Sequence, residues 1–127
     1  MPSNKDQDFL DFIVDQLSGL RSISSRRMFG GIGLYQATTF FAIIDEGRLY
    51  FVTDDATRSE YTQRGMVPFQ YAPGKFIATY YEVPVDVLED SDALSDWARA
   101  AVSAQARRSM KRPKRKRAAS VVRRKPS

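Results

Sequence analysis

The acidic and basic residues of this chain occupy different parts of the sequence. All fifteen Asp and Glu residues lie at or before Asp96, whereas residues 107–127 contain eleven Lys and Arg residues and no acid. Residues 1–106 hold nine basic and fifteen acidic residues, so that their formal charge is −6. A like-charged segment with few apolar side chains cannot bury enough surface to fold alone. We therefore predict one domain over residues 1–106 and a disordered basic tail over residues 107–127.

The absence of Cys and His from the sequence narrows the chemistry open to the domain. Disulfides, thiolate zinc sites and Cys nucleophiles are excluded, and both the commonest metal ligand and the usual general base near neutral pH are missing. The acidic pairs Asp54-Asp55 and Asp90-Ser91-Asp92 stand at predicted helix starts, where capping explains them. We expect a non-enzymatic protein with no catalytic, cofactor-binding or metal-binding residues.

The apolar segments are too short to enter a membrane. Residues Met1 to Gln7 are polar and lack the apolar run of a signal peptide. No stretch approaches the roughly 18 apolar residues that a spanning helix needs. We expect a cytoplasmic protein without a membrane span.

Apolar spacing predicts two helices, and capping residues predict a third. The first has a face formed by Phe9, Leu10, Ile13, Leu17 and Leu20, and the last has a face formed by Leu94, Trp97, Ala98, Ala101 and Val102. Capping residues at 53–55 and Gly65 predict a short helix over residues 56–64 between them. The outer side of the first helix carries an acidic stripe, Asp8, Asp11 and Asp15, which is typical of a solvated face or of a docking site for a basic segment.

Alternating apolar residues predict the strands. Apolar residues alternate with a period of two from Arg27 to Tyr35, which predicts one strand. Two further strands, 39–44 and 48–53, are joined by a turn containing Gly47. Pro73-Gly74 fits a type II turn between strands 68–71 and 75–83. The predicted order is α-β-β-β-α-β-β-α, which is an α+β domain whose antiparallel sheet is packed by helices.

The segment Gly30-Gly31-Ile32-Gly33 is the only glycine cluster, and its spacing matches no phosphate-binding motif. We expect a strand bulge or close packing against the sheet there. A second segment is rich in tyrosine, and strand alternation places Tyr80 and Tyr81 on opposite faces. One of them is therefore predicted in the core and the other on the second face, which is either covered or binds a partner.

The basic tail is the clearest functional signal, because each cation placed on a phosphate releases counterions. Its candidate nucleic-acid-binding residues are Arg107, Arg108, Lys111, Arg112, Lys114, Arg115, Lys116, Arg117, Arg123, Arg124 and Lys125. The tail has no interleaved aromatic residues, so binding to DNA or RNA is expected to be largely non-specific. A solubilising or self-docking tail, or one that meets an anionic membrane or protein, stays open at this point.

Several segments together resemble the TfoX/Sxy N-terminal domain family. They are Arg27-Met-Phe-Gly-Gly-Ile-Gly33, the hairpin around Gly47, Phe69-x-Tyr71, Tyr80-Tyr81-x-Val83-Pro84 and Leu94-x-x-Trp97. The resemblance implies a two-layer α-β(3)-α-β(2)-α fold similar to secretion-chaperone-like domains, bacterial origin and no enzymatic activity. For full-length members it also implies regulation of DNA uptake and competence together with the cyclic-AMP receptor protein. This chain carries the basic tail where those regulators have a second, helical domain.

These observations predict a regulatory or adaptor domain that resembles competence (DNA transformation) regulators. Its expected partners are a protein of the transcription machinery and, through the tail, DNA or RNA. The alternative is a protein-protein interaction module whose tail docks on an acidic partner or on the acidic stripe of its own first helix.

Overall fold

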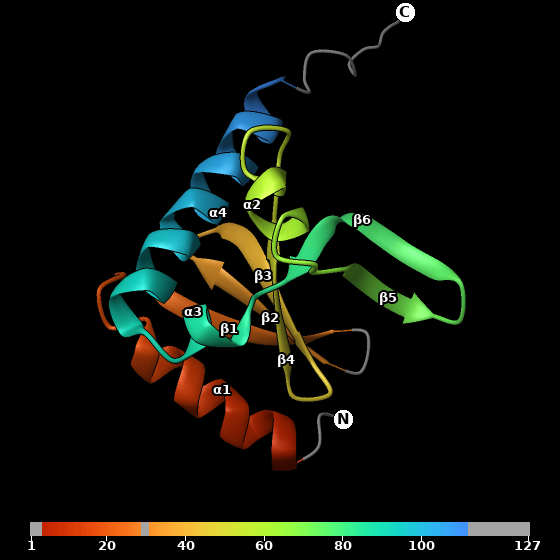
Figure 1. Ribbon diagram of the computed structural model, residues 1–127. Coiled ribbons are helices and arrows are strands. Elements are labelled where there is room, and N and C mark those ends of the chain that lie inside the picture. Colours follow the sequence, from red (N-terminus) through yellow and green to blue (C-terminus); the bar gives the residue numbers. More distant parts are fainter. Residues whose placement is uncertain (1–3, 29–30, 112–127) are drawn as a thin grey trace, which may run out of the picture.

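The computed structural model describes residues 4–28 and 31–111, which form four helices and six strands. Figure 1 shows their arrangement. In chain order the elements are α1 (Asn4–Gln16), β1 (Ile23–Met28), β2 (Gly31–Gln36), β3 (Thr39–Asp45), β4 (Arg48–Val52), α2 (Arg58–Thr62), β5 (Pro68–Ala72), β6 (Lys75–Glu82), α3 (Val85–Leu88) and α4 (Ser91–Lys111).

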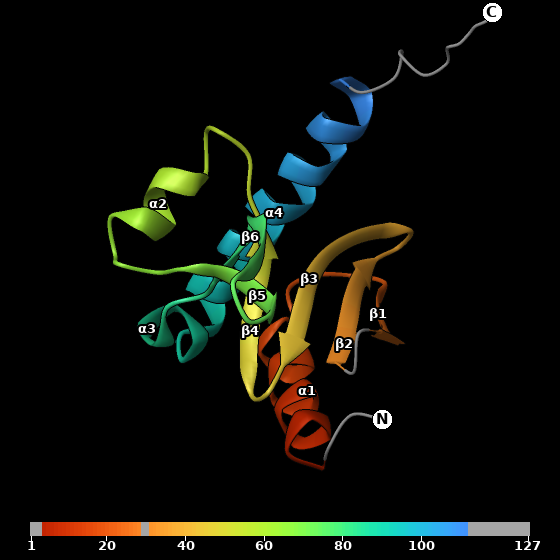
Figure 2. The same ribbon diagram turned by 90° about the vertical axis from the view of Figure 1, so that its right-hand side faces the viewer.

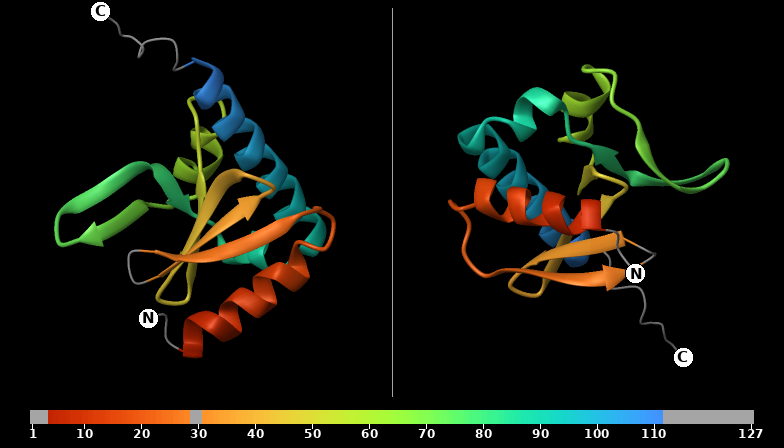
Figure 3. Two further views of the ribbon diagram at one scale, coloured as in Figure 1. Left: turned by 180° about the vertical axis from the view of Figure 1, so that it is seen from behind. Right: turned by 90° about the horizontal axis from the view of Figure 1, so that it is seen from below.

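The strands form one six-stranded antiparallel sheet in the order β1-β2-β3-β4-β6-β5. The long helix α4 packs on β3 and β4, and α1 packs on α4 and β3. Figure 2 shows α2 and β1 on opposite sides of the central strands. The hairpin formed by β5 and β6 projects away from α1 and α4 (Figures 1 and 3). The predicted α+β class with an antiparallel sheet is confirmed.

Two elements were not predicted. The strand predicted from Arg27 to Tyr35 is in fact two strands, because β1 ends at Met28 and β2 begins at Gly31, and Met28 pairs with Gly31. Most of β1 is exposed at the edge of the sheet, so its sequence has no apolar alternation that could indicate a strand. The other element, α3, is a single turn that follows Pro84.

The glycine cluster is explained by close packing. A Cβ atom on Gly31 would clash with the carbonyl oxygen of Ile44 in β3, whereas one on Gly33 would lie 2.6 Å from Met28 Cε and 2.9 Å from Phe40 Cε1. The pairing of β2 with β3 also shifts between Leu34 and Tyr35, as in a bulge. The structural interpretation of Gly31 and Gly33 is thus confirmed, and Gly30 lies outside the described residues.

The core lies between the sheet and the helices. Ile13 of α1, Leu17 directly after this helix, and Leu94 and Ala98 of α4 are almost fully buried, which confirms that these apolar residues face the core. The three carboxylates of the acidic stripe on α1 are exposed. Both predicted hairpin turns are present, with positive φ at Gly47 (74°) and at Gly74 (72°).

Candidate functional site

The predicted nucleic-acid-binding residues fall into two groups in the structure. Arg107 and Arg108 lie in the last turns of α4, and the helix ends at Lys111. The other predicted residues lie outside the described part of the chain: Arg112, Lys114, Arg115, Lys116, Arg117, Arg123, Arg124 and Lys125. The structure therefore describes the root of the basic segment, while its predicted disorder beyond Lys111 stays a prediction.

Helix α4 continues past Ala106, where the sequence analysis placed the end of the folded domain. The end of the acidic half of the sequence is therefore not the end of the helix, because alanine and arginine are both strong helix formers. Ala104 is fully buried, and Gln105 Nε2 donates a hydrogen bond of 2.8 Å to the carbonyl oxygen of Phe40 in β3. These contacts hold the end of α4 on the sheet.

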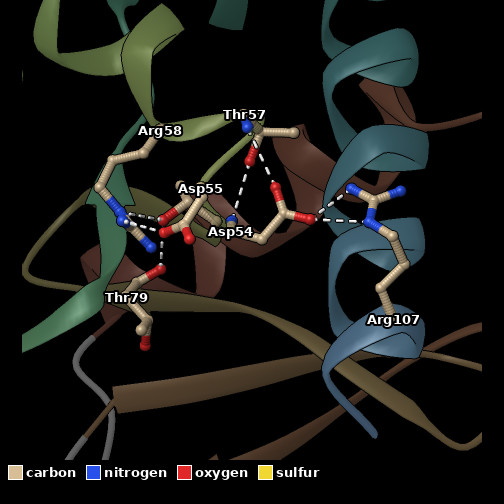
Figure 4. A network of polar contacts seen from close by, with 7 residues as sticks. Asp54, Asp55, Thr57, Arg58, Thr79 and Arg107 are labelled. Atoms are coloured by element: carbon tan, nitrogen blue, oxygen red, sulfur yellow. Dashed lines mark hydrogen bonds and ion pairs between the residues drawn. The ribbon is translucent and has the colours of Figure 1, made fainter. Parts of the chain in front are cut away.

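An ion pair joins the end of α4 to the segment between β4 and α2 (Figure 4). Arg107 Nε donates to Asp54 Oδ2 at 2.7 Å. The Asp54 side chain is only 16% exposed, whereas that of Arg107 is 51% exposed. Arg107 therefore has a structural partner within the domain. Because its guanidinium already pairs with a shielded carboxylate, it is a poor candidate for a phosphate contact.

The same aspartate caps the turn that leads into α2. Asp54 Oδ1 accepts a hydrogen bond from the Thr57 amide at 3.0 Å, and the Asp54 amide donates to Thr57 Oγ1, also at 3.0 Å. Burial alone would raise the pKa of Asp54, but the hydrogen bonds from Arg107 and Thr57 outweigh it and lower the pKa below its usual value. Asp54 thus caps the turn before α2, while Thr57, the N-cap residue of α2 itself, makes no side-chain capping bond.

A second set of contacts ties α2 to the sheet. Arg58 donates to Asp55 Oδ1 at 3.1 Å and to Thr53 Oγ1 at 3.2 Å, and the buried Thr53 hydroxyl donates to the Thr79 carbonyl oxygen at 2.9 Å. Figure 4 shows Arg58 and Arg107 on the two sides of the Asp54-Asp55 pair. The polar network at this end of the domain is therefore a set of internal contacts.

Several arginines of the described surface are matched by carboxylates. Five arginines, Arg48, Arg58, Arg64, Arg99 and Arg107, form ion pairs with Glu82, Asp55, Glu60, Asp96 and Asp54. Within the described residues, no group of three or more Asp or Glu side chains is arranged to hold a metal ion. None of the described helices is both long enough and apolar enough to cross a bilayer.

The tyrosines separate as the strand alternation predicts. Tyr80 is buried, with its ring 5.6 Å from that of Phe40, and burial raises its pKa to about 12. Tyr81 is half-buried beside Tyr61, at 6.0 Å between ring centroids. Tyr71 is 54% exposed on the projecting hairpin. Of the tyrosines in the described part of the chain, Tyr71 on the β5–β6 hairpin is the exposed one.

No sequence pattern indicated the pair of Asp54 and Arg107. The two residues are separated by 53 positions, and no periodicity or motif relates them. Each looked like a member of a local group, one a helix cap and the other part of the tail. Only the position of α4 across the sheet brings them together.

The fold and these contacts define a small α+β domain whose described polar network is internal and whose last helix leads into a basic segment. Residues 15–105 match the family model of the TfoX N-terminal domain, and the chain belongs to this family. The family consists of regulatory or adaptor domains and is not a known enzyme family. A comparison with curated proteins gives no match.

Proposed function

We propose that this protein is a non-enzymatic regulatory or adaptor domain related to competence regulators, and that its basic segment binds DNA or RNA without sequence preference. The folded body contacts a protein partner, which in this proposal is a component of the transcription machinery. The segment after Lys111 keeps that complex near nucleic acid. The charge distribution is the observation that supports the nucleic-acid part most directly.

The body is a poor polyanion ligand by itself. Its formal charge is negative, and five of its arginines are in ion pairs that a phosphate would have to disrupt. Eight basic residues follow Lys111 without any acid. If about six of these charges met phosphates, log K would fall with log salt at a slope near −5 for duplex DNA.

The test compares the full chain with a chain that ends at Lys111. Ending there, rather than at Ala106, keeps the pair of Arg107 and Asp54 and the last turn of α4. Binding to a short DNA duplex and to RNA is measured by fluorescence anisotropy over a salt series. We expect strong, salt-dependent binding by the full chain and a large loss for the shortened chain.

A full-length variant serves as the matched comparison. Replacing Arg115, Lys116 and Arg117 by Gln removes three charges from the tail and should lower the salt slope by about 3 × 0.9. The control replaces Lys75, an exposed residue at the start of β6, by Gln and should leave the slope unchanged. Equal affinities for the full and shortened chains would refute the role of the tail.

A further inference from the structure

A groove of about 600 Å³ lies between the β3–β4 turn and the projecting β5–β6 hairpin. Tyr50 and Glu82 are neighbours in the register of β4 and β6, and both line the groove. Its opposite wall contains Tyr71 of β5 and Phe76 of β6. Figures 1 and 3 show that this hairpin projects away from α1 and α4.

The charged residues of the groove leave an excess of negative charge. Glu82 pairs with Arg48 at 3.2 Å, whereas Asp45 and Glu46 line the groove without an ion pair to any other described residue. Asp6 lies close by, because its Oδ1 accepts a hydrogen bond from the Gly47 amide at 2.8 Å. Burial, followed by the nearby charges of Glu46 and Asp6, raises the pKa of Asp45. A cation bound here would relieve this crowding of carboxylates.

The aromatic walls suit the same kind of ligand. Tyr71 is 54% exposed and Phe76 is 49% exposed. Arginine and lysine side chains bind over aromatic rings as well as to carboxylates. Guanidinium groups in particular stack on such rings while they keep their hydrogen bonds to carboxylate oxygens. The half-buried Asp45, the exposed Glu46 and the exposed rings together therefore fit a segment rich in Arg and Lys.

We propose that this groove binds Arg123-Arg124-Lys125 of the same chain. Arg123 follows Lys111 by twelve residues, which span roughly 40 Å when extended. A domain of this size has a radius of gyration near 13 Å, so a straight line between opposite surfaces is about 35 Å. The segment therefore reaches the groove in a nearly extended conformation. Groove and nucleic acid then compete for these three cations, although groove binding does not depend on the proposed nucleic-acid binding.

The groove offers more than the acidic stripe on α1, which is another negative surface of the domain. Asp8, Asp11 and Asp15 are exposed on a convex helix, where ion pairs are weak because both partners stay hydrated. In the groove Asp45 and Glu82 are half-buried, and rings supply additional contact area. Docking in the groove and docking on α1 therefore predict different outcomes of the same experiment.

The absence of Cys from the chain makes a spin-label experiment direct. A nitroxide attached to the full-length Ser127→Cys variant would lie next to the proposed docking residues. At low salt we expect the amide signals of residues 45–47, 71 and 76 to lose most of their NMR intensity. The loss should vanish at about 1 M salt, where the Debye length is about 3 Å.

Charge variants in the labelled chain provide the matched control. Asp45→Asn with Glu46→Gln should restore the groove signals, whereas Asp8→Asn with Asp15→Asn, which removes the same number of charges from α1, should not. Strongest broadening on α1, or uniform weak broadening, would overturn the proposal. A mixture of spin-labelled chains without NMR isotopes and isotope-labelled chains without a spin label tests whether docking is intramolecular. Equal broadening in this mixture would show docking between molecules and would also overturn the proposal.

The outcome is separable from that of the nucleic-acid test. Groove broadening in a chain that fails to bind DNA or RNA would support the docking site while the proposed function fails. Loss of nucleic-acid binding on shortening, with no broadening in the groove, would do the reverse.

Discussion

Arg107, near the end of α4, donates a hydrogen bond to Asp54 at 2.7 Å. This contact joins the last helix to the segment between β4 and α2. Asp54 also accepts a hydrogen bond from the Thr57 amide, so one carboxylate makes both contacts. The end of α4 is thereby part of the folded domain. The first two predictions concern this pair.

Breaking the pair should destabilise the domain modestly. We expect Arg107→Gln to lower the free energy of unfolding by up to about 1 kcal/mol, because the ion pair is partly exposed. Asp54→Ala should cost about 1–2 kcal/mol, since it also removes the side-chain cap of the turn before α2. Urea unfolding of both single variants and the double variant gives the coupling energy. The Asp96–Arg99 pair, exposed on α4, is the control and should couple more weakly; equal coupling in the two pairs would contradict the argument.

The same pair should make stability sensitive to acid. The folded state lowers the pKa of Asp54, so its stabilising contribution is present above the unfolded value, 3.8, and is lost as pH falls through the folded value. In Arg107→Gln this acid-dependent loss should be smaller. Unfolding free energies measured from neutral pH down to below 3.8 provide the comparison, and identical pH profiles for the two proteins would disprove it.

Asp45 should behave in the opposite sense. Its pKa is raised in the folded state, chiefly by burial, so its ionised form destabilises the domain at neutral pH. The favourable contribution of the protonated group is present below 3.8 and is lost as pH rises through the folded pKa. Asp45→Asn should therefore increase stability at neutral pH, with a gain that shrinks on acidification. Thermal unfolding at several pH values tests this, and a variant less stable at neutral pH would exclude it.

Alanine should be costly at both described glycines of β2, to different degrees. A methyl at Gly31 meets the backbone of Ile44, which cannot move away, whereas at Gly33 it meets the flexible end of Met28. We expect a loss of about 3 kcal/mol or more for Gly31→Ala and about 1–3 kcal/mol for Gly33→Ala, in the range of overpacked cores.

A second substitution separates the two cases. Met28→Ala should recover part of the loss caused by Gly33→Ala, because it removes the side chain that the new methyl meets. It should not rescue Gly31→Ala. Urea unfolding measures all four variants, with Ser25→Ala on the exposed edge strand as the control. A larger cost at Gly33 than at Gly31 would show that packing against Ile44 does not set the requirement.

The elements that could be predicted are those whose own residues report their environment. Ile13 and Leu17 recur at helical spacing because one side of α1 faces the core, and Gly74 marks its turn by a backbone conformation that other residues avoid. In contrast, β1 is exposed at an edge and leaves no alternation, so it merged with β2 in the prediction. The glycines of the cluster could be assigned to packing, but not to the particular atoms that they approach.

The sequence by itself determined the fold class, the helix faces, both hairpins and the location of an acid-free basic segment, because each depends on neighbouring residues or on composition. The tertiary structure decided where α4 ends, which carboxylate holds Arg107, and that Asp45, Tyr71 and Phe76 line one groove. These relationships join residues far apart in the chain, so they exist only once the sheet has fixed the distances between its elements.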